Sequence, residues 1–284
     1  MAQQGEPFFE PPVELTFDVP AAAGLLLDFL HRETHKAGFT RAVLGLSGGV
    51  DSAAAAALAC RALGARNVLC ALLPYRTSNP ASLRDARRVI RLLGARSAFI
   101  GITPMIDAYY ARDRHAPRLR RGNKMARERM AILYDLSARE RALVIGTSNK
   151  TELLLGYGTI FGDMASGLNP LGDLYKTQVR MLALHLGIPP DIVWKTPTAD
   201  LWAGQTDEGE IGHRYADIDR LLILLVDRRS GPREVLAAGF PPRMLERVTR
   251  LIASSQFKRC PPLIAKVSPR TIGVDFRYPR DWGR

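Results

Sequence analysis

Short apolar runs alternate with helix-forming stretches along the first half of the chain. Residues 41–46 (RAVLGL), 67–74 (NVLCALLP) and 142–147 (ALVIGT) have the length and composition of buried strands. Helix-like stretches lie between them, among them residues 53–64 and 78–94. This alternation predicts right-handed βαβ units, and therefore an α/β fold with a central parallel sheet flanked by helices. Ligands of such folds bind at the carboxyl ends of the strands.

The second half of the chain has a different pattern. Beyond Lys176 the sequence becomes helical, and residues 189–212 are rich in Pro, Asp and Gly. A loop of that length predicts a mobile lid over a functional site. We expect a single domain over residues 1–284, with the core sheet at about 20–185 and a helical C-terminal part and tail at 213–284.

Charge and hydropathy narrow the possible partners. The chain has 40 Lys and Arg against 28 Asp and Glu, a formal net charge of +12. The basic residues gather at 112–129 and from Arg243 onward, which indicates either a solvated surface or an anionic partner such as a nucleic acid or a phosphate-rich ligand. No apolar run reaches the roughly 18 residues of a transmembrane helix, and the first residues lack the order of a signal peptide. We therefore expect a cytoplasmic protein without a membrane partner.

The three cysteines, Cys60, Cys70 and Cys260, match no spacing of a zinc site, and their odd number argues against a disulfide framework. Cys60 lies in an Ala-rich helical stretch and Cys70 in an apolar strand-like run. We expect these two to be buried as small hydrophobic side chains without a chemical role.

Residues 47–52 (SGGVDS) connect the first expected strand to an Ala-rich helix. Gly48 and Gly49 allow a tight turn that brings backbone N–H groups close to a ligand, and the helix N-terminus favours an anion there. A phosphate fits this description. Asp51 beside a phosphate needs a divalent cation between them, so we expect it to bind magnesium. The alternative is an ordinary strand–turn–helix in which Asp51 and Ser52 only cap the helix.

No lysine follows the two glycines, so the loop is not a Walker sequence. It resembles the loop of the pyrophosphate-loop ATP pyrophosphatase superfamily, whose members cleave ATP between the α and β phosphates, adenylate a carboxyl or carbonyl oxygen and release pyrophosphate. The resemblance implies an adenine nucleotide alpha hydrolase-like fold. It also implies that ATP is a co-substrate, bound by Gly45, Leu46, Ser47, Gly48, Gly49, Val50, Asp51 and Ser52.

Further motifs narrow the family. The chain resembles NAD synthetases, in order and spacing, at residues 121–130 (RGNKMARERM), 146–163 (GTSNKTELLLGYGTIFGD), 173–179 (DLYKTQV), 198–208 (TADLWAGQTDE), 257–262 (FKRCPP) and 277–282 (RYPRDW). The resemblance thus covers nearly the whole chain. It implies a ligase that forms a carbon–nitrogen bond: an NAD(+) synthetase that amidates deamido-NAD with ammonia through an adenylated intermediate, releasing AMP and pyrophosphate.

The resemblance also implies roles for single residues. Asp51 and Lys176 match the catalytic set, and Thr147, Lys176 and Thr198 match ATP contacts. Asp51 and Glu152 match ligands of Mg²⁺, although Glu152 could also be a first-turn acid that the helix dipole favours. The residues that match deamido-NAD contacts are Asn123, Arg127, Phe257 and Lys258. Two further polar candidates, whose roles the sequence does not separate, are Asp163 and Asp207.

The match departs from the ammonia-dependent family pattern at two positions. Ile160 and Gly167 stand where ammonia-dependent members carry a Lys and an Asp that contact deamido-NAD, so those contacts are open. The surrounding stretch is closer to glutamine-dependent relatives. Those relatives carry an amidase domain with a Glu–Lys–Cys set, but the residues before Ser47 are too few to build one and include no cysteine. We therefore expect free ammonia as the nitrogen donor, unless a separate glutaminase delivers it. The family also implies a homodimer.

Two other interpretations remain. A tRNA-modifying or other amide-forming member of the superfamily would account for the net charge of +12, but thiolating members often carry paired cysteines, which are missing here, so we expect no nucleic-acid partner. Binding to tRNA that weakens steeply with salt would support that alternative. A nucleotide-binding module without turnover is the second alternative. The presence of Asp51, Glu152 and Lys176 together argues against it.

Overall fold

The computed structural model of the protein describes residues 12–202, 204–260 and 262–272. In this part of the chain, parallel strands form one sheet in the order β3-β2-β1-β4. The strands are β1 (Ala42–Gly45), β2 (Val68–Leu72), β3 (Arg96–Phe99) and β4 (Leu143–Val144). The central strand β1 pairs with both neighbours, Ala42 lying opposite Val68 of β2 and Leu143 of β4. The predicted α/β fold with a parallel sheet is confirmed.

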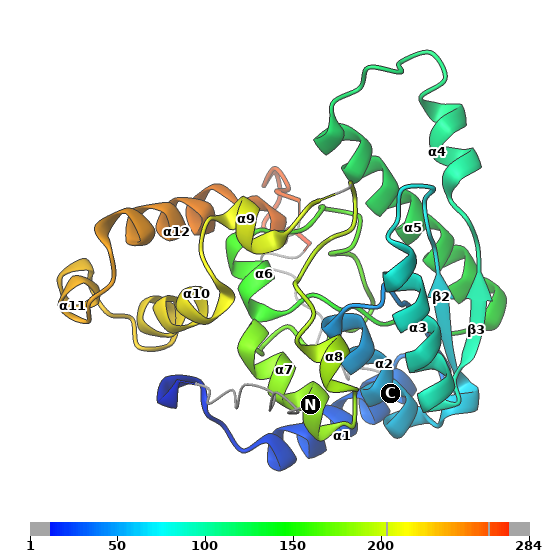
Figure 1. The fold of residues 1–284 in the computed structure, drawn as a ribbon, viewed down its shortest axis with the longest axis horizontal. Coiled ribbons are helices and arrows are strands. Elements are labelled where there is room, and N and C mark those ends of the chain that lie inside the picture. Colours follow the sequence, from blue (N-terminus) through cyan, green and yellow to red (C-terminus); the bar gives the residue numbers. More distant parts are fainter. Residues whose placement is uncertain (1–11, 203, 261, 273–284) are drawn as a thin grey trace, which may run out of the picture.

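Helices cover both faces of the sheet (Figure 1). One face shares a hydrophobic core with α1 (Val19–Lys36), α2 (Val50–Leu63), α3 (Pro80–Leu93) and α7 (Lys176–His185). The other face packs against α4 (Thr103–Tyr109) and α5 (Arg118–Glu140). Because successive side chains of a strand point to opposite faces, the neighbours Val43 and Leu44 of β1 belong to different cores.

Helix α2 lies at the centre of the molecule, and its composition fits that place. Residues 53–59, six alanines and one leucine, are all 0% exposed. The helix contacts α1, α7 and the sheet, so small side chains allow close packing on several sides at once.

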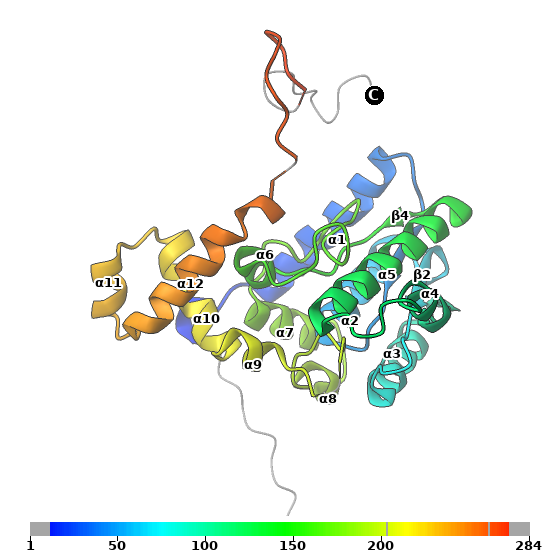
Figure 2. The same ribbon diagram turned by 90° about the horizontal axis from the view of Figure 1, so that it is seen from above.

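A third core joins the C-terminal helices to α6 (Lys150–Leu155). These helices are α10 (Tyr215–Leu222), α11 (Pro232–Ala237) and α12 (Pro242–Ser254), and they lie to one side of the sheet in both views (Figures 1 and 2). A π-helical segment, Ile223–Asp227, continues α10. The remaining elements are short: η1 (Val13–Leu15), η2 (Ala65–Asn67), α8 (Pro190–Val193), α9 (Asp207–Ile211) and η4 (Gln256–Lys258).

The strand order determines where a ligand can bind. The chain passes from β1 to β2 and β3 on one side, then returns to β4 on the other side of β1. The connections that leave β1 and β4 therefore diverge, which opens a crevice at the carboxyl ends of these two strands. The SGGVDS loop leaves β1 there, and Gly146 and Thr147 follow β4.

Some predicted bounds differ from the structure. Of the expected strand 142–147, only Leu143 and Val144 join the ladder, and Ile145 continues it through a single bridge to Leu168. The expected loop 189–212 contains the short helices α8 and α9. Its mobility, and the organisation as a single domain, stay predictions. The motif at 277–282 lies outside the described residues.

Candidate active site

The SGGVDS loop adopts a shape that glycine makes possible. Gly48 has φ +85°, and a Cβ atom at this position would lie 2.1 Å from the Ser82 carbonyl oxygen of α3. The hydroxyl of Ser52 donates to the Gly49 carbonyl at 3.0 Å and accepts from the Ser47 backbone N–H at 3.2 Å. The loop is therefore held against the first turn of α2, where backbone N–H groups without helical partners face the crevice.

Three charged side chains from separate elements meet beside this loop. Lys176 is the first residue of α7 and is 2% exposed. Its Nζ lies 2.5 Å from Asp51 Oδ2, in the first turn of α2, and 3.1 Å from Glu152 Oε1 of α6. Burial alone would lower the pKa of Lys176, but the two carboxylates raise it above its ordinary value. The group is thus a buried ammonium held between two acids.

Asn149 fixes both acids. Its amide Nδ2 donates to Asp51 Oδ1 at 2.9 Å, and its Oδ1 accepts from the Glu152 backbone N–H at 2.9 Å. The Glu152 side chain reaches back to the Asn149 backbone N–H, which completes a capping box at the start of α6. Asn149 was not among the predicted site residues, although an Asn followed three residues later by Glu at a helix start is the signal for this motif.

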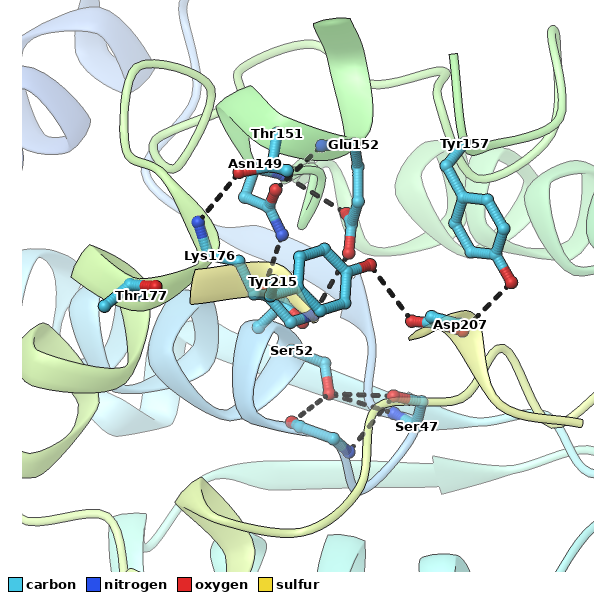
Figure 3. A network of polar contacts seen from close by, with 12 residues as sticks. Ser47, Ser52, Asn149, Thr151, Glu152, Tyr157, Lys176, Thr177, Asp207 and Tyr215 are labelled. Carbon is cyan, nitrogen blue, oxygen red and sulfur yellow. Dashed lines mark hydrogen bonds and ion pairs between the residues drawn. The ribbon is translucent and has the colours of Figure 1, made fainter. Parts of the chain in front are cut away.

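A second polar cluster connects the 189–212 loop to these groups. Asp207, the first residue of α9, is 4% exposed and accepts hydrogen bonds from the hydroxyls of Tyr157 at 3.0 Å and Tyr215 at 3.3 Å (Figure 3). The ring of Tyr215 lies 5.1 Å from Lys176 Nζ, within range of a cation–π interaction. Burial raises the pKa of Asp207, and Lys176 opposes this shift. The sequence predicted neither tyrosine.

Two adjoining pockets occupy the crevice. The first is mainly apolar and lies between the ends of β1, β2 and β4, with Leu72, Leu73 and Met130 in its wall. The second, here called the polar pocket, is the more polar of the two and is lined by the SGGVDS loop, the three charged groups and Asp207. The residues that line both are Ser47, Ser52, Ser82, Thr147, Asp163, Thr198, Ala199 and Asp200. An apolar pocket continuous with a polar, helix-capped one is the shape that a nucleoside polyphosphate needs.

The predicted ATP residues line these pockets. Gly45 and Leu46 lie in the apolar pocket, and Lys176 lies in the polar one. The others, which lie in the polar pocket or at the junction, are Ser47, Gly48, Gly49, Val50, Asp51, Ser52, Thr147 and Thr198. Lys195 is a further pocket residue that the sequence analysis missed. Its Nζ lies 2.7 Å from Asp85 Oδ2.

Three of the predicted deamido-NAD residues surround one short segment, residues 156–160, rather than the pockets. Arg127 Nε donates to the Ile160 carbonyl at 3.2 Å, and Asn123 Oδ1 accepts from the Thr159 hydroxyl at 2.8 Å. Lys258 Nζ donates to the carbonyls of Gly156 and Gly158, both at 2.7 Å. The fourth, Phe257, adjoins Lys258 in the chain and is 62% exposed. Thr159 itself lines the apolar pocket, so this region adjoins the crevice.

The two positions that depart from the family pattern are accommodated differently. A Cβ atom at Gly167 would lie 2.6 Å from Leu143 Cδ1, because this glycine packs directly on β4. A side chain at this position would require Leu143 to move. Ile160 instead contributes its carbonyl oxygen, which holds Arg127.

The residues of the polar pocket fit a cation. Asp51 and Glu152 already converge on one positive charge, the ammonium of Lys176. Within the described ranges, no group of three or more His, Cys, Asp or Glu side chains could hold a metal ion. A metal held here would therefore take its other ligands from water or from phosphate oxygens, which is how magnesium usually binds.

Comparison with known proteins gives one family. A family model described as NAD synthase matches residues 23–262. The NH(3)-dependent NAD(+) synthetase of Trichlorobacter lovleyi is 55% identical over 260 residues, covering 92% of this chain and 95% of the relative. Among solved structures, the NH3-dependent NAD synthetase from Campylobacter jejuni has a TM-score of 0.75 at 34% identity, covering 88% of this chain and 100% of its own. The NMN synthetase from Francisella tularensis has a TM-score of 0.79 at 33% identity, covering 88% and 99%.

Proposed function

This chain belongs to the NAD synthase family and is a carbon–nitrogen ligase that forms NAD with ammonia, and we propose that the reaction takes place in the two adjoining pockets. The observation that carries this proposal is the meeting of Asp51, Glu152 and Lys176 beside the SGGVDS loop, at the polar end of a pocket suited to a nucleoside. The comparisons do not favour a tRNA-modifying enzyme or a module without turnover.

ATP binds with its base in the apolar pocket and its phosphates against the loop. The backbone N–H groups at the start of α2 offer donors to the phosphates, and Ser47, Ser52, Thr147 and Thr198 stand where the two pockets join. Lys176 is the buried cation of the polar pocket and is assigned to the phosphates. This arrangement leaves the α-phosphorus near the junction, open to a second substrate.

We assign Asp51 and Glu152 to Mg²⁺, because both carboxylates already face one positive charge. When bound, the ion supplies charge neutralisation on the pyrophosphate leaving group. The protein's own contribution is to hold the two acids in place, through Asn149 and the capping box of α6.

The nicotinate end of deamido-NAD is assigned to the region around residues 156–160. Arg127, Asn123 and Lys258 gather there beside the apolar pocket, and two of them are cationic. The carboxylate attacks the α-phosphorus, which gives an acyl adenylate and pyrophosphate. Ammonia then attacks the activated carbonyl carbon and AMP leaves. No side chain needs to form a covalent bond, since positioning and electrostatics suffice for both steps.

The 189–212 loop is assigned to water exclusion, because an adenylate exposed to water would be hydrolysed. Asp207 ties its end to two tyrosines, and Asp200 accepts from the Asn79 backbone N–H at the start of α3 at 2.9 Å.

In the described part of the chain, no helix is long and apolar enough to cross a membrane. We propose a cytoplasmic homodimer, with a separate glutaminase as an optional source of ammonia.

A direct assay tests the proposal. Purified protein receives ATP, Mg²⁺ and deamido-NAD with either ammonium or glutamine, and NAD is measured by chromatography. We expect NAD with ammonium and none with glutamine alone. Nicotinate mononucleotide is offered in parallel, since the fold is also similar to an NMN synthetase. Turnover of the mononucleotide without turnover of deamido-NAD would overturn the assignment of the larger substrate.

A further inference from the structure

Helix α10 and its π-helical continuation carry two carboxylates, Asp219 and Asp227, that contact α6 and the start of α7 without lining either pocket. Asp219 is 0% exposed. Its Oδ1 accepts from the Thr151 hydroxyl at 2.6 Å, and its Oδ2 accepts from the Thr177 backbone N–H at 2.8 Å. None of the sequence motifs includes this residue, and it lines neither pocket.

Both partners of Asp219 adjoin a residue of the charged group. Thr151 precedes Glu152 in α6, and Thr177 follows Lys176 in α7. The Thr151 hydroxyl also accepts from the Lys176 backbone N–H at 3.0 Å (Figure 3). One buried carboxylate therefore ties together the first turns of the two helices that carry Glu152 and Lys176. Free N–H groups of a helix start need such a partner, and the positive end of the helix dipole favours a carboxylate there.

Asp227, in the π-helical segment, also connects the start of α6 to the start of α7. Its Oδ1 lies 2.9 Å from Lys150 Nζ of α6, and its Oδ2 accepts from the hydroxyl of Tyr175, the N-cap residue of α7, at 3.0 Å. In a regular α-helix, residues eight positions apart would be rotated by about 80° from each other. The π-helical turn, closed by the bond from Arg228 N to the Ile223 carbonyl, adds a residue to the turn and reduces that rotation.

We propose that Asp219, supported by Asp227, is a positioning residue that sets the separation of Glu152 and Lys176 and thereby the affinity of the polar pocket for metal-bound ATP. The inference rests on the proposed function, because it assigns those two residues to metal and phosphate. The same helix also carries Tyr215, which contacts both Asp207 and Lys176. The C-terminal helices thus have a role in the site, beyond packing against it.

The test compares two isosteric substitutions on one helix. Asp219→Asn has one acceptor oxygen where the carboxylate has two, so either the Thr151 hydroxyl or the Thr177 N–H loses its acceptor. Asp217→Asn is the matched control, since Asp217 is partly exposed and pairs with Arg214, three positions away on the same helix start. Calorimetry measures binding of Mg²⁺ with α,β-methylene-ATP, which the enzyme cannot cleave, and steady-state kinetics and melting temperatures are measured alongside.

For Asp219→Asn we expect roughly tenfold or greater losses in analogue affinity and in kcat, as is usual for groups that orient metal ligands. The KM for deamido-NAD stays within about twofold, because residues 156–160 are not attached to Asp219. Asp217→Asn matches the wild type in every measurement. A folded Asp219→Asn protein with wild-type affinity and kcat would overturn the proposal.

A second pair of variants decides the matter if Asp219→Asn does not fold. Thr151→Val removes the hydroxyl that joins Asp219 to the Lys176 N–H, whereas Thr151→Ser keeps it. We expect Thr151→Val to lose analogue affinity and Thr151→Ser to recover most of it; equal affinities would overturn the proposal. Failure of the proposed function is distinguishable, because the wild type would then form no NAD, whatever the order of analogue affinities among the variants.

Discussion

Lys176 Nζ lies 2.5 Å from Asp51 Oδ2, although the two residues are 125 positions apart in the sequence. Glu152 Oε1 completes the contact at 3.1 Å, so one buried ammonium lies between two carboxyl groups. Because Asp51 belongs to α2, Glu152 to α6 and Lys176 to α7, the contact joins three helices at the carboxyl edge of the sheet. Before substrate binds, these three side chains stabilise the fold by holding the three helices together.

Replacing Lys176 with Met should therefore destabilise the protein. The substitution leaves Asp51 and Glu152 buried without their counter-charge, and breaking a buried pair in this way costs about 3–5 kcal/mol. Added Mg²⁺ should restore part of the loss, because it supplies the missing positive charge. Denaturant unfolding with and without Mg²⁺ measures both effects. Lys195→Met is the control: its pair with Asp85 is more exposed, at 23% for each side chain, so its loss should be about 1 kcal/mol or less. Unchanged stability of Lys176→Met would contradict this reading of the cluster.

The two glycines of the SGGVDS loop should differ sharply on substitution. Gly48 has φ +85°, and a Cβ there would lie 2.1 Å from a backbone oxygen of α3, so Gly48→Ala should cost about 3 kcal/mol or more of unfolding free energy. Gly49 has φ −93°, and a Cβ would meet only Ser47 Oγ at 3.5 Å. Gly49→Ala should therefore cost only about 1 kcal/mol. Thermal unfolding ranks the pair; equal losses would show that the close approach of α3 does not restrict the loop.

Much of this arrangement could be predicted from the sequence, because local patterns determine it. Apolar runs and helix formers predicted the parallel sheet, and a glycine pair between strand and helix predicted the tight turn that the structure has at Gly48. The motifs also identified Asp51, Glu152 and Lys176, although their contact depends on the tertiary fold. Cys60 and Cys70 are buried, as expected from their apolar surroundings.

Other features could not be predicted because they depend on long-range packing. Asp219 lies in a helix whose sequence looks like an ordinary amphipathic surface helix, and only the fold shows that its carboxylate meets α6 and α7. Tyr157 and Tyr215 likewise donate to Asp207, although they lie 50 and 8 positions from it in the sequence. The length of strand β4 was overestimated, since residues 146 and 147 line the crevice instead of extending the ladder.

Arg127→Ala should raise the KM for deamido-NAD much more than the KM for ATP. Arg127 is exposed, holds the Ile160 carbonyl and lies outside both pockets. Losing one charge-assisted contact costs about 1.5–3 kcal/mol, which corresponds to roughly tenfold or more in KM for deamido-NAD. The KM for ATP should stay within about twofold. Arg118→Ala, at the exposed start of the same helix, is the control and should change neither constant. An equal rise in both KM values for Arg127→Ala would remove this residue from the deamido-NAD site.

The cysteines should differ in their reaction with iodoacetamide. Burial raises the pKa of Cys60 to about 11, and burial together with Cys60 raises that of Cys70 to about 12. Because the thiolate is the reactive form, both remain protonated and unreactive at pH 8, and raising the pH to about 9.5 should not change this. Cys260 is exposed and should react first. Peptide mapping of the folded protein identifies the site, and Cys260→Ser should abolish the fast phase. Equal labelling of Cys60 in the folded state would contradict the burial of α2.

The formation of an adenylate is the central claim, and oxygen transfer tests it most directly. Deamido-NAD labelled with ¹⁸O in the nicotinate carboxylate is converted with ATP, Mg²⁺ and ammonium, and the products are analysed by mass spectrometry. Attack of the carboxylate on the α-phosphorus predicts AMP that carries one ¹⁸O atom, with unlabelled pyrophosphate. Labelled orthophosphate together with ADP, or AMP without the label, would contradict it.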